Sequence, residues 1–255
     1  PELIEKTLER SVFMDSNAVS VAWEGIIDDA VKKYPKLDRN KFLEILNGFD
    51  PDDIPEKSRQ KSDVFTITYT GSLYTIQNPE NLFHAVSELI EEGKIDQNKI
   101  LFQFVGRIAD EVLKTIENSN LKENIKIFTY QPHSKVMEIL ADSDCALLIG
   151  VDSAEKMTNV PGKTFEYIGI KNPVLTLAPE KSKLAEVVNS SGLGKIADHN
   201  DIGRLKQIFY DLYVDWQNGQ NSVSIDHALI QKHSRVDKTK KLADVLDEIK
   251  TTDNS

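Results

Sequence analysis

The stretch that decides the fold covers residues 159–175 and reads NVPGKTFEYIGIKNPVL. It combines a turn, the start of a helix predicted over 163–170 and the start of a strand predicted over 173–177. Pro161 suits a first helical turn, and Gly162 lets a ligand approach the main chain closely. Because the first amides of a helix have no partners within it, this helix tip can bind an anion such as phosphate.

Two charged side chains belong to the same predicted helix. Lys163 places a cation beside the expected anion site, and Glu166 follows about one turn later on the same helix face. A carboxylate there can accept hydrogen bonds from a sugar diol. The pair therefore predicts a diphosphate contact and a ribose contact. The alternative interpretation is structural, since Pro-Gly often precedes a helix and an acid in the first turn meets the helix dipole favourably.

The composition is that of a globular protein with a sizeable core. The chain has 255 residues, of which 40% are hydrophobic and 28% charged. A net charge of −10 argues against general binding to nucleic acid or to an anionic membrane, so phosphate binding has to be local. The single cysteine, Cys145, excludes an internal disulfide and a Cys-rich metal site. There is no long apolar run and no secretory signal pattern, which favours a cytoplasmic protein, and a start at Pro1 indicates a fragment.

From residue 63 onward, buried strands alternate with amphipathic helices. Strands are expected over 64–69, 100–105, 125–128, 145–149, 173–177 and 194–196, and helices over 79–92, 109–118, 134–141, 163–170, 182–189 and 202–216. This alternation predicts an α/β fold: a Rossmann-like parallel sheet with helices on both faces. A ligand crevice is then expected at the carboxyl ends of the strands.

The chain ends differ from this regular part. Residues 1–60 read as an incomplete N-terminal α/β segment, with helices over 2–10 and 24–33 and strands over 17–22 and 42–46. A polar, proline-punctuated stretch then predicts a boundary near residue 60. The last helix, over 238–249, has an apolar face that we expect to pack on the N-terminal segment. The predicted domains are therefore 1–60, 61–235 and 236–255.

Three further strand ends carry candidate ligand contacts. Two of them run into glycine, whose main-chain amides can reach a phosphate or a sugar, and one runs into a loop that can flank a flat base with an aromatic ring. Each also fits an ordinary turn or an exposed side chain. No histidine has partners at metal-ligand spacing, so no metal site is predicted. The candidates are Gly71, Ser72, Gly106, Arg107, Tyr130, Gln131 and Pro132.

The order and spacing of these pieces resemble the donor-binding half of the group-one retaining glycosyltransferases, which have the GT-B fold. The resemblance rests on residues 70–73 (TGSL), 104–107 (FVGR), 130–132 (YQP), 142–144 (DSD) and 161–173. Residues 46–50 (LNGFD) resemble the hinge of that family. The resemblance implies the C-terminal half of a GT-B enzyme, preceded by the last elements of an acceptor-binding domain that is mostly absent.

What the resemblance implies for function is transfer of a sugar from a nucleotide-diphosphate sugar to a glycan or lipid-linked acceptor, in bacterial-type glycan or cell-surface polysaccharide synthesis. It implies no cofactor, no nucleic acid and no membrane contact except through the absent domain. The diphosphate would meet Gly71, Ser72, Gly162, Lys163 and Thr164, while Glu166 would hold the ribose. Gly106 and Pro132 would also line the site, and Tyr130 with Gln131 would flank the base. The implied catalytic residues are Lys163, Arg107 and Glu166.

The sequence departs from the family pattern at two places. The family's paired carboxylates stand eight residues apart, but Thr158 stands eight residues before Glu166, so Asp152 or Glu155 would have to serve. The basic pair of the first glycine loop is replaced by Ser72 and by Gln77 or Asn78. Two alternatives therefore stay open: a nucleotide-sugar epimerase, and a non-catalytic nucleotide- or partner-binding domain. As a fragment, the chain is expected to bind a donor and to transfer poorly by itself.

Overall fold

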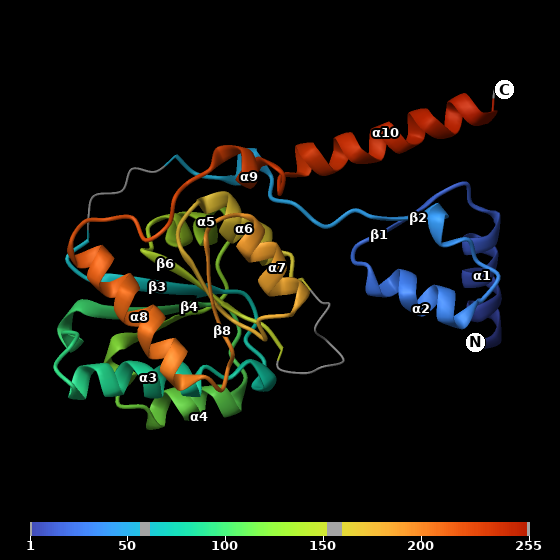
Figure 1. Cartoon of the computed structure of the whole chain (residues 1–255). Helices are drawn as coiled ribbons and strands as arrows, with labels where there is room; N and C mark the ends of the chain where they lie inside the picture. The colour runs from blue at the N-terminus through green and yellow to red at the C-terminus, as the bar shows by residue number, and fades with distance from the viewer. Residues whose placement is uncertain (1, 57–61, 152–159, 254–255) are drawn as a thin grey trace.

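A six-stranded parallel sheet forms the centre of the larger of two α/β units in the computed structural model, which describes residues 2–56, 62–151 and 160–253 (Figure 1). The strands lie in the order β5-β4-β3-β6-β7-β8. The chain thus starts at β3 in the middle, winds to one edge, and returns to wind to the other edge from β6. In such sheets the ligand crevice opens at this switch point. The strands are β3 (Phe65–Thr70), β4 (Ile100–Val105), β5 (Ile125–Phe128), β6 (Cys145–Ile149), β7 (Val174–Leu177) and β8 (Gly194–Ala197).

Helices cover both faces of this sheet, which confirms the predicted Rossmann-like α/β fold (Figure 1). One face carries α3 (Glu80–Glu91), α4 (Asp110–Asn118) and α8 (Ile202–Gln217). The other carries α5 (His133–Ala141), α6 (Lys163–Ile170) and α7 (Lys183–Ser190). Every one of these strands and helices lies within one residue of its predicted bounds. Short 3₁₀ helices occur at Arg39–Lys41 (η1), Pro51–Asp53 (η2), Thr75–Gln77 (η3), Gln97–Lys99 (η4) and Lys122–Asn124 (η5).

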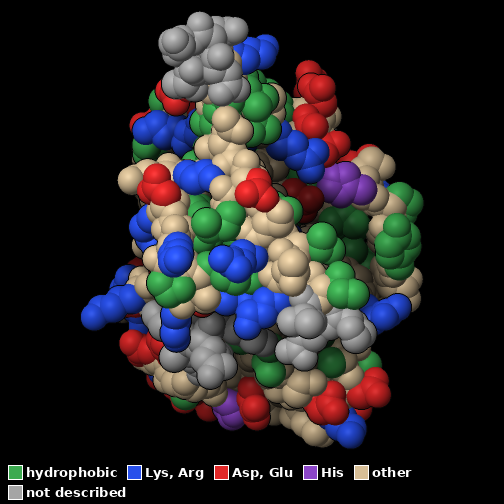
Figure 2. All heavy atoms as spheres, turned by 90° about the vertical axis from the view of Figure 1, so that its right-hand side faces the viewer, with side chains coloured by type: hydrophobic (Ala, Val, Ile, Leu, Met, Phe, Trp, Pro, Cys, Tyr) green, Lys and Arg blue, Asp and Glu red, His purple; other side chains and the backbone are tan. Residues whose placement is uncertain are grey.

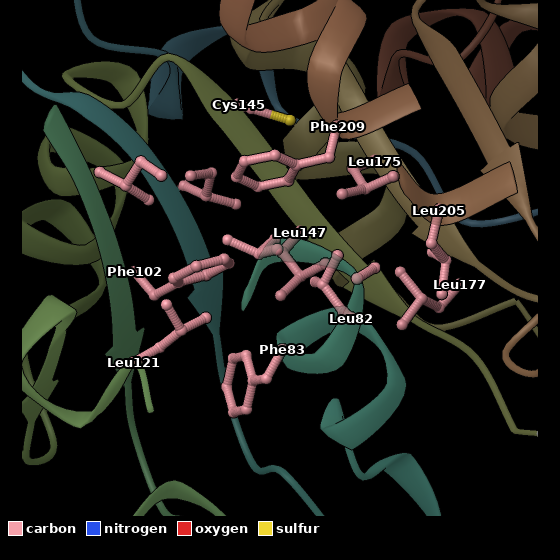
Figure 3. Packing of buried hydrophobic residues seen from close by; sticks show 14 of the residues in the cluster. Leu82, Phe83, Phe102, Leu121, Cys145, Leu147, Leu175, Leu177, Leu205 and Phe209 are labelled. Atoms are coloured by element: carbon pink, nitrogen blue, oxygen red, sulfur yellow. The ribbon is translucent and has the colours of Figure 1, made fainter. Parts of the chain in front are cut away.

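The packing of the core explains why the strands and helices could be predicted from the sequence. Phe102 of β4 stacks on Phe209 of α8 with ring centroids 6.0 Å apart, and leucines from β6, β7 and α3 surround them (Figure 3). Strands covered on both faces consist of nearly continuous apolar residues. Cys145 lies in this core as a free cysteine, and burial raises the pKa of its thiol to about 12, so it is an inert apolar residue.

The smaller unit contains α1 (Glu2–Asp15), β1 (Val19–Val21), α2 (Gly25–Lys33) and β2 (Phe42–Glu44), with β1 and β2 parallel. Helix α1 extends beyond the predicted end at residue 10. The reason is tertiary: Phe13 packs edge-on against Tyr34 and Phe42, with centroids 6.3 and 5.4 Å apart, and this contact holds the last turn in place. The predicted boundary near residue 60 lies outside the described residues.

Two segments that connect the units run side by side. The Phe49 amide donates to the carbonyl of His233 at 3.0 Å, and the Arg235 amide donates to the carbonyl of Phe49 at 2.7 Å. A Cβ at Gly48 would lie 2.7 Å from the Arg235 nitrogen, so glycine is needed for this close crossing. Lys183 of α7 also lies 3.4 Å from Glu44 of β2. Arg235 also lies 3.3 Å from Asp50, so main-chain bonds and these ion pairs join the described parts of the chain here.

The two C-terminal helices lie on either side of this crossing in the chain. Helix α9 (His227–Gln231) was not predicted, because five residues are too few for a helical pattern. Helix α10 (Arg235–Asp253) includes the predicted helix, but Leu242 and Leu246 of its apolar face are 41% and 53% exposed. Its packing on the N-terminal segment therefore stays a prediction. Among the described residues, no helix is both long and apolar enough to span a membrane.

Candidate functional site

Two glycine loops meet where β3 and β4 end. Gly71 and Gly106 have φ angles of +97° and +133°, a region that favours glycine. The Gly71 amide donates to the Val105 carbonyl at 2.8 Å, and the Gly106 amide donates to the Phe128 carbonyl at 2.9 Å. A Cβ at Gly106 would lie only 2.4 Å from the Gly71 carbonyl oxygen. The loops therefore pack main chain against main chain, beside the switch point of the sheet.

The tip of α6 lies open across from these loops. Among the described residues, and apart from its chain neighbours and its own helix, nothing lies within 4 Å of the position that a Cβ on Gly162 would take. The amides of Thr164 and Phe165 already donate to the carbonyls of Pro161 and Gly162, at 3.0 and 3.1 Å. This first turn leaves the amides of Gly162 and Lys163 as the donors that an anion at the tip would use.

The Lys163 side chain reaches from the helix tip back to the first glycine loop. Its Nζ donates to Tyr69 Oη at 2.5 Å and to the Thr70 carbonyl at 3.0 Å, and lies 3.8 Å from the centre of the Tyr69 ring. Burial lowers the pKa of Lys163 to about 8, and nearby Glu166 only partly opposes that effect. The ammonium is therefore held among neutral partners at the meeting point of the two elements.

Two buried tyrosines hold the first glycine loop in place. Tyr69 Oη donates to the Ser72 carbonyl at 2.7 Å, and Tyr167 Oη accepts the Thr70 amide at 2.8 Å. Burial raises the pKa of both hydroxyls, so both stay protonated. Because Tyr167 belongs to α6, it ties that helix to the end of β3.

A cavity of about 560 Å³, which we call the β3–α6 cavity, opens between these elements. Eight predicted site residues line it: Gly71, Ser72, Gly106, Tyr130, Gln131, Gly162, Lys163 and Glu166. Three do not belong to its lining. Arg107 and Pro132 are exposed at the surface, and the Thr164 side chain is fully buried. Most of the predicted set, which comes from three loops and the start of α6, is thus gathered around one hollow.

Glu166 lies between this cavity and a smaller hollow of about 220 Å³ at the crossing of the two units. It is neither buried nor fully exposed, and the smaller hollow also contains Asn47, Asp53 and Arg235. His133, which lines the β3–α6 cavity, lies 3.4 Å from Asp53. The carboxylate of Glu166 is therefore next to the segments that join the units.

The residues that replace the family's basic pair have structural partners. Gln77 is buried, and its Nε2 donates to the Ile149 carbonyl at 2.6 Å. Asn78 Nδ2 donates to Thr115 Oγ1 at 2.9 Å. Both amides are thus engaged within the fold. Asp152 and Glu155, the candidates for the front carboxylate, lie outside the described residues.

Charge around the site is local rather than spread over a surface. Figure 2 shows Lys and Arg side chains interspersed with acidic and apolar side chains on one face of the molecule. No described carboxylate lies within ion-pair distance of Lys163. Attraction of an anion to the β3–α6 cavity therefore depends on single groups.

Sequence reasoning missed several residues of the site. Tyr69 and Tyr167 were given no role, and neither was Tyr74, which is exposed and lines the cavity. A polar atom on a fully buried aromatic side chain was the available signal, since a buried tyrosine hydroxyl usually needs a partner.

Comparison with known proteins identifies the family. A family model described as glycosyl transferases group 1 matches residues 50–207. This chain belongs to that family. No curated protein matches the chain by sequence. The predicted resemblance to group-one glycosyltransferases is therefore confirmed, and the chain falls in the glycosyltransferase class of enzymes.

Solved structures share the fold over nearly the whole chain. The Anabaena protein HepE, solved in complex with UDP and glucose, is 14% identical, with a TM-score of 0.71, and the match covers 97% of this chain and 68% of HepE. A glycosyltransferase from Rickettsia africae is 18% identical, with a TM-score of 0.67 and coverage of 98% and 67%. WaaG, a glycosyltransferase involved in lipopolysaccharide biosynthesis, is 18% identical, with a TM-score of 0.62 and coverage of 84% and 60%. These likenesses establish the GT-B type of fold.

Proposed function

We propose that this chain binds a nucleotide-diphosphate sugar in the β3–α6 cavity and supplies the donor half of a retaining glycosyl transfer. The diphosphate would meet the main chain of Gly71 and the amides of Ser72, Gly162 and Lys163, together with the Lys163 ammonium. Glu166 would accept hydrogen bonds from the ribose, and Tyr130 with Gln131 would flank the base. HepE, whose fold is similar, was solved with UDP and glucose, which supports a donor of this class.

The observation that carries the proposal is the place of Lys163. Its Nζ lies 3.0 Å from the Thr70 carbonyl and 3.5 Å from where a Cβ of Gly71 would stand, so it is next to the glycine loop and the helix tip at once. Amides and one cation converging on one cavity are the groups that stabilise a diphosphate. Arg107 is exposed and outside the cavity lining, so we give it a lesser part.

In the proposed reaction, the bond between the anomeric carbon and the diphosphate oxygen breaks while the acceptor oxygen bonds to the same face of that carbon. The acceptor proton passes to the leaving diphosphate. Stabilising the charge that develops on this leaving group is the main service of such a site, and here Lys163 would provide most of it. A glycan or lipid-linked acceptor would be presented by a second domain, whose closure orients the reactants and excludes water. Bacterial-type polysaccharide synthesis is the setting we favour.

Calorimetry with UDP, GDP and their sugars tests the proposal. We expect one nucleotide to bind with one-to-one stoichiometry and Lys163→Met to weaken its binding at least tenfold at pH 7.5. Lys135→Met is the matched control, because Lys135 is an exposed lysine of α5 paired only with Glu138 at 2.9 Å, and it should leave the affinity within twofold of the original. Absence of binding by every diphosphate nucleotide would refute the proposal.

A second candidate is favoured by Gln77 and Asn78. Both side chains are uncharged and form hydrogen bonds within the fold. They therefore supply no cation that would speed departure of the diphosphate. A domain that binds a nucleotide without transferring its sugar would have this arrangement. It predicts tight binding of UDP or GDP together with no release of nucleotide from the sugar donor, even when an acceptor-binding domain is supplied.

A further inference from the structure

The contacts of Lys163 differ from those of an ordinary anion-binding lysine. Two of the three N–H donors of an ammonium are directed to Tyr69 Oη and to the Thr70 carbonyl, and neither acceptor carries a charge. The Tyr69 ring face lies 3.8 Å away and adds only a weak attraction. Among the described residues, the ammonium is thus held in a fixed place with no counter-charge within ion-pair distance.

Tyr69 is built to hold that place. Its side chain is 1% exposed, and its hydroxyl donates to the Ser72 carbonyl at 2.7 Å, which leaves an oxygen lone pair for Lys163. Because the hydroxyl is bonded at both ends, neither the loop nor the lysine can shift alone. Tyr69 thereby links the position of the cation to the position of the glycine loop.

We propose that Tyr69 is a positioning residue that holds Lys163 among uncharged partners beside the β3–α6 cavity, so that binding of a nucleoside diphosphate is coupled to uptake of a proton by Lys163. The inference rests on the proposed function, because it describes how that same site would accept its ligand. Tyr69 itself does not touch the ligand. It acts through Lys163, whose remaining N–H donor is the one available to a phosphate.

The sign of the pH dependence follows from the charges. Burial holds the pKa of free Lys163 at about 8, and a bound diphosphate, as a close anion, raises it again. About one-tenth of the free lysine is unprotonated at pH 7, half at pH 8 and nine-tenths at pH 9. Proton uptake on binding therefore rises with pH through about 8, and affinity falls up to tenfold for each pH unit above that value.

Other charged and titratable groups around the cavity can be separated from this effect. They are Glu166 of α6, His133 of α5, and Tyr74 and Tyr130 of the loops. Lys163→Met leaves all of these groups in place. The difference in proton uptake between the unmodified protein and Lys163→Met therefore reports on Lys163.

The test is calorimetric titration of the protein with UDP at pH 7.5, 8.0, 8.5 and 9.0, each in two buffers of different ionisation enthalpy. We expect uptake to rise from about one-quarter to about nine-tenths of a proton over this range. Lys163→Met should abolish the uptake. Tyr69→Phe keeps the ring and removes only the hydroxyl; it should release Lys163 toward solvent, reduce uptake at pH 8.5 to less than half and weaken UDP binding three- to tenfold.

Each outcome decides a separate point. UDP binding with no proton uptake between pH 7.5 and 9.0 would overturn the inference and leave the proposed function intact. An unchanged uptake curve in Tyr69→Phe would remove Tyr69 from its positioning role. If Tyr69→Phe unfolds, the comparison of the unmodified protein with Lys163→Met still decides the proton uptake. Failure of UDP and GDP to bind at any pH would instead refute the proposed function itself.

Discussion

Replacing Tyr167 by phenylalanine tests whether the link between α6 and the glycine loop is real. Tyr167 is fully buried, and its hydroxyl accepts the Thr70 amide at 2.8 Å and lies 3.2 Å from Thr70 Oγ1. Without it, a buried amide loses its acceptor, which costs about 1–3 kcal/mol of unfolding free energy. We expect a loss of about 2 kcal/mol in urea unfolding followed by circular dichroism, with an unchanged m-value.

The chain offers a matched control in Tyr213, a buried tyrosine whose hydroxyl accepts the Asp96 amide at 3.2 Å, away from the cavity. Tyr213→Phe should cost about 1 kcal/mol, because that contact is longer and only partly buried. Calorimetry with UDP separates the two variants: Tyr167→Phe should weaken binding at least fivefold, and Tyr213→Phe should leave it within twofold. Equal affinities, or a stability loss below about 0.5 kcal/mol for Tyr167→Phe, would refute the reasoning.

Two further substitutions test the loops and the acid. Gly106→Ala places a Cβ 2.4 Å from the Gly71 carbonyl at φ +133°, so it should cost about 1–3 kcal/mol of stability in urea unfolding and abolish UDP binding. Gly162→Ala, at φ −56° in open space, should keep full stability, and equal stability of the two variants would contradict the model of packed glycine loops. Glu166→Ala should weaken UDP binding by about 1 kcal/mol, or about fivefold, in calorimetry, whereas Glu186→Ala, at an exposed position of α7, should not. An unchanged affinity would remove Glu166 from the site.

The fold of the larger unit could be read from the sequence because its central strands, β3, β6 and β7, are covered on both faces. A short apolar run such as Cys145–Ile149, which is buried along its whole length, is typical of a central strand. The helices between such runs carry one apolar face. The prediction ended helix α1 too early, because contacts between residues far apart in the chain hold its last turn. Phe13 packs on Tyr34 and Phe42, and the local sequence pattern gives no sign of these contacts.

The candidate site was predictable where main-chain geometry determines it. Gly71 and Gly106 stand at positive φ at strand ends, and Gly162 opens a helix, so residue type alone points to the crevice. Arg107 was predicted for the site but does not line the cavity. Its place after a glycine in the sequence does not show where its side chain lies.

The contact between Lys163 and Tyr69 could not be predicted from the sequence. Tyr69 is 94 residues away in the chain and belongs to a strand buried along its whole length, where alternation gives no sign of which side chains face a ligand. The same Thr70 main chain is bonded by Tyr167 through its amide and by Lys163 through its carbonyl. Helix α6 thus bonds to both main-chain groups of Thr70, the last residue of β3. Because these bonds fix the ammonium relative to the first glycine loop, we propose that Lys163 supplies the positive charge beside that loop.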